Sequence, residues 1–122
     1  MVGKEHHAVK LGGAGAAPRL SALVVAHNEE ARLAECLETL RFADELVVVL
    51  DKCTDGSKAI AARFTDRLIE GSWELEAERQ HAGIAACDGD WIVHLDADER
   101  VPPALAAEIR AAIADAEPGY FL

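Results

Sequence analysis

The sequence lacks long hydrophobic runs and paired cysteines, and each absence removes a class of protein. No apolar segment approaches the roughly 20 residues that a helix needs to cross a membrane, and the N-terminus has no secretory hydrophobic region. The three cysteines, Cys36, Cys53 and Cys87, are far apart and form no CxxC or Cys/His pair of the kind that binds zinc. They are typical of reduced thiols, so the sequence predicts a soluble, cytoplasmic protein.

Basic residues are also few. The 122 residues include 22 acids and only 12 lysines and arginines, which gives a net charge of −10. This charge has the wrong sign for a nucleic-acid phosphate backbone, so we expect no nucleic-acid partner. An anionic ligand would need a metal ion, or local arginines and backbone N–H groups, to invert the electrostatic field at its site.

Apolar residues make up 51% of the chain, enough to bury the core of one domain. Residues 1–19 include the small-residue segment LGGAGAAP and show no periodicity, so we predict a flexible leader. Its glycines follow no predicted strand, which argues against a phosphate-binding loop. The predicted domain covers residues 20–122.

Apolar runs alternate with amphipathic segments throughout this domain. LSALVVA (20–26), ELVVVL (45–50), DRLIEG (66–71) and DWIVHL (90–95) predict strands, and GYFL (119–122) predicts the start of another. The segments between them predict helices within 28–42, 53–64 and 72–87 and from Pro102 onwards. This order predicts an α/β fold, a Rossmann-like, mostly parallel sheet with flanking helices.

Two predicted helices carry recognisable signals. Asn28 is expected to cap the first helix, with Glu29 and Glu30 in its first turn. The apolar stripe of that helix consists of Leu33, Cys36, Leu37 and Leu40. The expected stripe of the last helix consists of Leu105, Ile109 and Ile113.

Polar side chains follow three of the predicted strands. In a parallel sheet the carboxyl ends of the strands form one edge, where ligands bind at the switch in strand order. His27 and Asn28 follow the first strand, Asp51 follows the second, and the carboxylates Asp96, Asp98 and Glu99 follow the fourth. Acids this close together repel each other and favour a bound cation, the alternative being a solvent-exposed acidic turn. The convergence of three segments favours a ligand and metal site.

These segments together resemble family 2 glycosyltransferases with the glycosyltransferase A-type fold. The resemblance runs from Leu20 to about Val101, on VVAHNEEARLAECLETL, DELVVVLDKCTDGSKAIA and EAERQHAGIAACDGDWIVHLDADERV. Within the family it looks closest to bacterial enzymes that add sugars to the lipopolysaccharide core. The catalytic domain of that family is considerably longer. The resemblance therefore implies that residues 20–122 are an N-terminal nucleotide-sugar-binding half, incomplete at the C-terminus.

The resemblance implies roles for four nucleotide-facing segments. Asp51 matches the acid that accepts a hydrogen bond from the nucleotide base, the alternative being a cap for the following helix. His27, Asn28 and Glu29 match the first nucleotide-facing loop, although His27 also fits a partly exposed loop histidine. Arg79 is expected to point inwards at phosphate or base, or else to lie on the surface as a partly buried arginine.

Asp96 and Asp98 match the family's DxD motif, whose acids hold a divalent metal and the ribose. Asp98 is then the direct ligand of Mg²⁺ or Mn²⁺, and Asp96 bridges to ribose or metal. Glu99 is expected to cap the turn or to lie behind the ligands. Carboxylate oxygens suit these ions, which would offset the charge on the leaving nucleoside diphosphate.

The chain departs from the family at three positions. Gln80 stands where the family usually has Asn, and Lys52 and Cys53 stand where it usually has small or acidic residues. The spacing of Asp51, Asp55 and Gly56 also fits part of an EF-hand loop, but Ala62 occupies the position that needs a bidentate glutamate.

As a whole, the resemblance implies inverting transfer of a sugar from a nucleotide-diphosphate sugar to a glycan or lipid-linked acceptor. It assigns no general base, and the chain alone is expected to be inactive. Peripheral membrane association through the missing half and a homo-oligomer are further expectations. A non-catalytic nucleotide-binding or interaction module is one alternative. A sugar-nucleotide pyrophosphorylase is another, but it needs a basic, glycine-rich loop where this chain has AHNEEARL.

Overall fold

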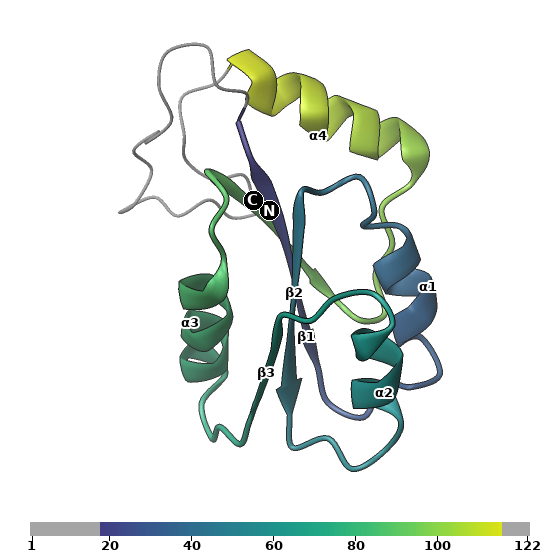
Figure 1. The fold of residues 1–122 in the computed structure, drawn as a ribbon, viewed down its shortest axis with the longest axis vertical. Helices are drawn as coiled ribbons and strands as arrows, with labels where there is room; N and C mark the ends of the chain where they lie inside the picture. The colour runs from purple at the N-terminus through teal and green to yellow at the C-terminus, as the bar shows by residue number, and fades with distance from the viewer. Residues whose placement is uncertain (1–17, 116–122) are drawn as a thin grey trace.

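A computed structural model describes residues 18–115 of the protein (Figure 1). Strands and helices alternate along the chain in the predicted order: β1 (Leu20–Ala26), α1 (Leu33–Glu38), β2 (Glu45–Asp51), α2 (Ser57–Ala62), β3 (Leu68–Gly71), α3 (Glu76–Ala86), β4 (Trp91–Asp96) and α4 (Pro103–Asp115). Most of the predicted leader and the strand predicted at 119–122 lie outside the described residues.

The four strands form one parallel sheet in the order β3-β2-β1-β4, which confirms the predicted α/β fold. β1 lies inside the sheet and pairs with β2 from Ser21↔Glu45 to Ala26↔Leu50. On its other side it pairs with β4, ending at Val25↔Asp96. The chain moves outward from β1 to β3 and then returns to the far side of β1. The switch in strand order therefore lies between β1 and β4.

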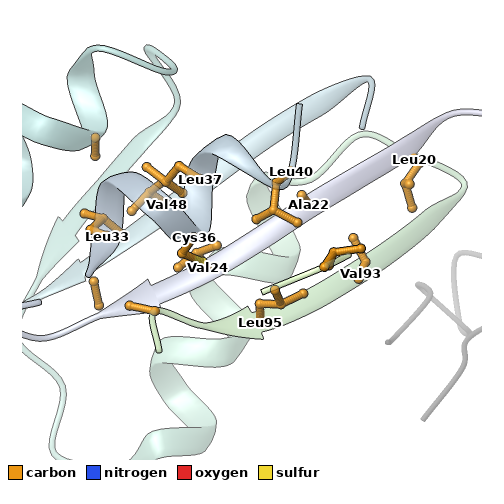
Figure 2. Packing of buried hydrophobic residues seen from close by; sticks show 14 of the residues in the cluster. Leu20, Ala22, Val24, Leu33, Cys36, Leu37, Leu40, Val48, Val93 and Leu95 are labelled. Atoms are coloured by element: carbon orange, nitrogen blue, oxygen red, sulfur yellow. The ribbon is translucent and has the colours of Figure 1, made fainter. Parts of the chain in front are cut away.

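Helices cover both faces of the sheet, which explains why the strand sequences are apolar without alternation. Figure 2 shows α1 lying over the sheet, with Cys36 near Val24 of β1 and Leu37 near Val48 of β2. α2 and α4 complete this core, and α3 covers the opposite face (Figure 1). The opposite core consists of Leu23, Val25, Val47, Val49, Cys87 and Ile92. The whole predicted stripe of α1 is buried, although Leu40 lies beyond the end of the helix.

Two predictions about helix signals are wrong. Asn28 does not cap α1, which begins only at Leu33; it adopts a left-handed backbone with φ of 50°, a conformation that asparagine tolerates better than most residues. Leu105 is 41% exposed. The buried face of α4 instead runs through Ala106, Ile109 and Ile113. Each i+4 step turns about 40° around a helix of 3.6 residues per turn, so Leu105 lies to the side of this face.

α3 approaches the sheet most closely at Gly83. A Cβ atom there would lie 2.6 Å from Leu23 Cδ1 and 2.8 Å from Val49 Cγ2. Both neighbours belong to strands and are fully buried, so little room exists for relaxation. The absence of a side chain at Gly83 therefore sets the distance between α3 and the two central strands.

Replacing Gly83 by valine should lower the free energy of unfolding by about 1–3 kcal/mol, because the added methyl groups overpack this contact. Ala85→Val, at an exposed position of the same helix, should cost only about 0.5 kcal/mol through helix propensity. Urea denaturation of the two variants measures the difference. Equal losses would contradict the close packing.

Candidate functional site

The carboxyl ends of β1, β2 and β4 border two adjoining pockets. The larger, of about 450 Å³, is lined by His27, Glu29, Asp51, Lys52, Trp73, Glu74, Glu76 and Arg79. The smaller, of about 270 Å³, is lined by Val25, His27, Glu29, Glu76, Arg79, Asp96, Ala97 and Asp98. Because the two share four residues, we treat them as one space and call it the edge cleft. It crosses the switch in strand order, where the sheet topology places a ligand.

Asp51 lies at the base of the larger pocket and is only 3% exposed. Its Oδ1 accepts a hydrogen bond from the Trp73 N–H at 3.1 Å, and its Oδ2 accepts one from Arg79 Nη1 at 3.0 Å. Burial alone would raise the pKa of Asp51, but these two donors outweigh it, so the pKa lies below its ordinary value. Asp51 is therefore an ionised, acceptor-only group at neutral pH.

Asp51 does not cap the following helix, so that alternative interpretation is wrong. The N–H of Ser57, the first residue of α2, donates to Asp55 Oδ1 at 2.9 Å. Asp55 therefore accepts the hydrogen bond at the start of α2, and the side chain of Asp51 faces the cleft.

Arg79 extends from α3 into the edge cleft rather than over the surface. Its side chain is 28% exposed, and its Nη2 lies 3.8 Å from Glu76 Oε1 in addition to the Asp51 contact. Its Nε is buried and has no hydrogen-bond partner among the described residues. Arg79 places a positive charge where both pockets meet.

The loop after β1 is fastened to the loop after β2. Asn28 Oδ1 accepts the backbone N–H groups of Thr54 at 2.7 Å and Asp55 at 3.2 Å. The Glu29 N–H donates to Ser57 Oγ at 3.0 Å. Asn28 lies outside both linings of the cleft, so its amide braces the loop that carries its neighbours.

His27 lies at the junction of the two pockets. Its Nδ1 is 2.8 Å from the backbone carbonyl oxygen of Asp51. Since a carbonyl only accepts, Nδ1 carries the proton in this contact. Nε2 is then the ring nitrogen that can meet a ligand.

The acidic turn after β4 forms the far wall of the edge cleft. Asp96 and Asp98 are exposed and line the smaller pocket. Glu99 caps the turn: its Oε1 accepts the Asp96 N–H at 2.8 Å, and its own N–H donates to Asp96 O at 2.9 Å. Asp98 Oδ2 lies 3.8 Å from Arg32 Nη1, an exposed pair across the mouth of the turn.

The donor set of this turn fits a hard divalent cation that shares its coordination with a ligand. Within residues 18–115 no three His, Cys, Asp or Glu side chains are grouped closely enough to enclose a metal. Mg²⁺, however, is typically held by one or two carboxylates together with phosphate oxygens and water. Asp96 and Asp98 supply such a pair of carboxylates on one wall of the cleft.

Trp73 and Glu76 also line the cleft, although neither is predicted from the sequence. The indole of Trp73 lies over Gly71, where a Cβ would come within 2.4 Å of its Cη2. A glycine at a strand end, two residues before a tryptophan, is the signal that could have pointed to this close approach.

The two departures from the family pattern after β2 have different settings. Lys52 has a left-handed backbone with φ of 54° and lines the larger pocket. Cys53 is half-buried, with its thiol 3.4 Å from Ala26 O, and burial raises its pKa. Cys53 therefore packs beneath the loop as a protonated thiol.

A second space, of about 430 Å³, lies at the opposite edge, where the strands begin. Most of its charged side chains already have a partner, since Arg41 pairs with Glu38 and Asp44 with Arg110. Arg67 bonds Asp88 at 2.6 Å and lies 3.7 Å from Glu45. The edge cleft, with charged groups from three strand ends, is the better candidate site.

None of the described helices is long and apolar enough to cross a bilayer.

Comparison with known proteins places this geometry in a family. Residues 21–121 match the family described as "Glycosyl transferase family 2". The lipopolysaccharide core biosynthesis glycosyltransferase LpsC of Rhizobium meliloti is 34% identical over 91 residues, 70% of this chain and 34% of that protein. An uncharacterized glycosyltransferase of Rickettsia felis is 32% identical over 92 residues, 75% of this chain and 32% of that protein. The chain thus spans about a third of the length of these curated relatives.

Solved structures show the same fold. The mannosyltransferase PcManGT from Pyrobaculum calidifontis, in complex with GDP-Man and Mn²⁺, is 24% identical with a TM-score of 0.65, over 85% of this chain and 34% of that one. The glucosyl-3-phosphoglycerate synthase of Mycobacterium tuberculosis, in complex with Mg²⁺ and UDP, is 21% identical with a TM-score of 0.60, over 68% and 35%. With the sequence match across nearly all of the described domain, these likenesses lead to one conclusion: the chain belongs to glycosyltransferase family 2.

Proposed function

We propose that this domain binds a nucleoside-diphosphate sugar and Mg²⁺ or Mn²⁺ in the edge cleft, as the donor site of an inverting glycosyltransferase. The observation that carries the proposal is the arrangement of charge. An ionised carboxylate at Asp51, a cation at Arg79 and the acid pair Asp96 and Asp98 line one continuous space. A nucleotide has its base, its phosphates and their counter-ion in the same order.

The base is proposed to lie in the larger pocket. Asp51 can accept a hydrogen bond from a ring N–H, such as N3–H of uracil or N1–H of guanine. UDP and GDP-mannose, the nucleotides named in the solved relatives, both carry such a group. Arg79 lies between this pocket and the acids, so its charge is available to the phosphates. His27 and Glu29 border the same junction.

The metal is proposed to bind at the acidic turn, with Asp98 as direct ligand and Asp96 reaching the metal or the ribose. When bound, it would offset the negative charge that develops on the leaving diphosphate. The chain itself presents the two carboxylates on one wall of the cleft. Glu99 contributes to this arrangement, because its two hydrogen bonds with Asp96 close the turn.

The acceptor is proposed to be the lipopolysaccharide core or another cell-envelope glycan, in keeping with the name of the Rhizobium meliloti relative. An inverting displacement also needs an acceptor hydroxyl held in line and a base within hydrogen-bond reach. No residue of the edge cleft is assigned to that task. The proposal for the described residues is therefore donor binding.

Binding of UDP should depend on the metal. The 122-residue chain should bind UDP at least roughly tenfold more tightly with Mn²⁺ than with excess chelator, a difference of about 1.4 kcal/mol, because the acids repel free diphosphate. Titration calorimetry measures both affinities. Uridine, which has no phosphate, serves as the control and should bind equally in both conditions. UDP affinity that ignores the chelator would contradict the metal site.

Asp98→Asn should remove the metal effect on UDP binding and leave the fold intact. Its carboxylate is exposed, and its one ion pair among residues 18–115 is with exposed Arg32 at 3.8 Å. The free energy of unfolding should therefore change by less than about 1 kcal/mol. Asp66→Asn, an exposed acid at the opposite edge, is the matched control. If both variants keep the metal effect, Asp98 is not the ligand.

Asp51→Asn should weaken uridine binding and also change how stability depends on pH. Because the folded pKa of Asp51 is lowered, its ionised form contributes stability above the ordinary pKa of about 3.9. That contribution is lost as the pH falls through the folded pKa. The stability gap between wild type and variant should therefore be larger at pH 7 than at pH 3, measured by urea denaturation. A gap that does not vary with pH would argue against the ionised pair.

A further inference from the structure

The acidic turn is held by an arginine that does not line the cleft. Arg100 Nη1 donates to two carbonyl oxygens of the turn, Ala97 O at 2.9 Å and Glu99 O at 2.8 Å. Its Nη2 donates to Arg32 O at 3.1 Å and to Glu35 Oε2 at 3.3 Å, both beside or within α1. One guanidinium group thus joins the turn to the helix.

A second arginine makes the reverse connection. Arg32, whose carbonyl accepts from Arg100, directs its own side chain at the turn, with Nη1 3.8 Å from Asp98 Oδ2. Arg100 therefore binds the backbone of Arg32, and the side chain of Arg32 reaches Asp98 across the same gap between α1 and the turn. The contact to Asp98 is exposed and weak, whereas the four bonds of Arg100 come from a side chain that is 28% exposed.

α1 also holds the two ends of the turn. At the start of the turn, the thiol of Cys36 donates to Asp96 O across 3.7 Å. Burial raises the pKa of this thiol to about 11, so it keeps its proton. At the end of the turn, the Val101 N–H donates to Thr39 Oγ1 at 3.2 Å. Between these points the contacts of Arg100 are what tie the turn's carbonyls to α1.

Geometry makes this task specific to arginine. The planar fork reaches carbonyls on two separate segments at once, which the single ammonium of lysine cannot do. Without it, the carbonyls of Ala97 and Glu99 lose a charged donor. Asp96 and Asp98, which repel each other, are then free to move apart. Metal binding must then bring the two carboxylates back together, and the free-energy cost of this ordering lowers the metal affinity.

We propose that Arg100 is a positioning residue, which holds the Asp96–Glu99 turn in the arrangement that binds the divalent ion and so sets the metal affinity of the donor site. This role rests on the proposed function. Arg100 acts through the backbone of the turn and is not itself among the residues that line the edge cleft.

The test compares Arg100→Lys with Arg110→Lys. Arg110 is a matched control, since it also donates to a backbone carbonyl, Phe42 O, and pairs with an acid, Asp44, away from the cleft. Mn²⁺ is titrated into each 122-residue chain at constant UDP. Arg100→Lys should need roughly tenfold more Mn²⁺ for half-saturation, and Arg110→Lys should behave as wild type. Uridine binding and melting temperature should not separate the two variants.

Hydrogen exchange in metal-free protein gives a second measure. Arg100→Lys should speed exchange of the Asp96, Glu99 and Val101 amides, because their acceptors, Glu99 Oε1, Asp96 O and Thr39 Oγ1, lie in the turn or in the segment it is tied to. Arg110→Lys should not. Unchanged Mn²⁺ affinity in Arg100→Lys, or equal loss of Mn²⁺ and uridine affinity, would overturn the positioning role. Wild-type UDP binding that ignores Mn²⁺ would overturn the donor site itself, and this role with it.

Discussion

The pairing of β1 on both sides is the constraint on which the rest of the structure depends. All seven of its residues are buried, its edges are bonded to β2 and β4, and helices cover both of its faces. A shift of register at either edge would move Asp51 or Asp96 along the strand axis by about 3.3 Å per residue. The distance between Asp51 and Asp96, which lie in the two halves of the edge cleft, is therefore set by hydrogen bonds within the core.

Electrostatics in this acidic chain are handled locally. The net charge is −10, yet Asp51 and Asp98, two acids that line the edge cleft, are each accompanied by a nearby cation. Asp51 has Arg79 and the Trp73 N–H, and Asp98 faces Arg32. At Asp51 these donors keep the carboxylate ionised and oriented while leaving lone pairs for a ligand. Negative charge elsewhere on the surface does not prevent an anion from binding where these cations lie.

Much of the fold and the position of the site follow from short-range patterns. The run LSALVVA predicts a strand buried on both faces, and an acid directly after such a strand lies at the sheet edge. This rule predicts the positions of Asp51 and Asp96. It does not predict the conformation of Asn28, because asparagine favours both a helix cap and a left-handed loop, and contacts with residues 54 and 55 decide between them. The prediction for Leu105 is wrong because a run of i+4 spacings drifts around the helix, and the spacing alone does not say which of its members face the core.

The contacts that hold the site lie beyond any local pattern. Arg79 could have faced solvent or the cleft on a helical wheel, and its partner Asp51 is 28 positions away. Arg100 and its contact at Arg32 are 68 positions apart. Charged side chains are common on surfaces, so such pairs carry no signature in one sequence. They become visible only when the sheet brings the segments together.

The placement of the two tryptophans gives the protein a natural optical reporter. Trp73 borders the larger pocket and is partly accessible, whereas Trp91 lies at the start of β4 with 4% of its surface exposed. Emission from the two indoles therefore comes from environments of different polarity, and only one of them adjoins the cleft. An occupant stacked near Trp73 would quench the redder component and leave the bluer one untouched, so occupancy can be followed by intrinsic fluorescence, without a label.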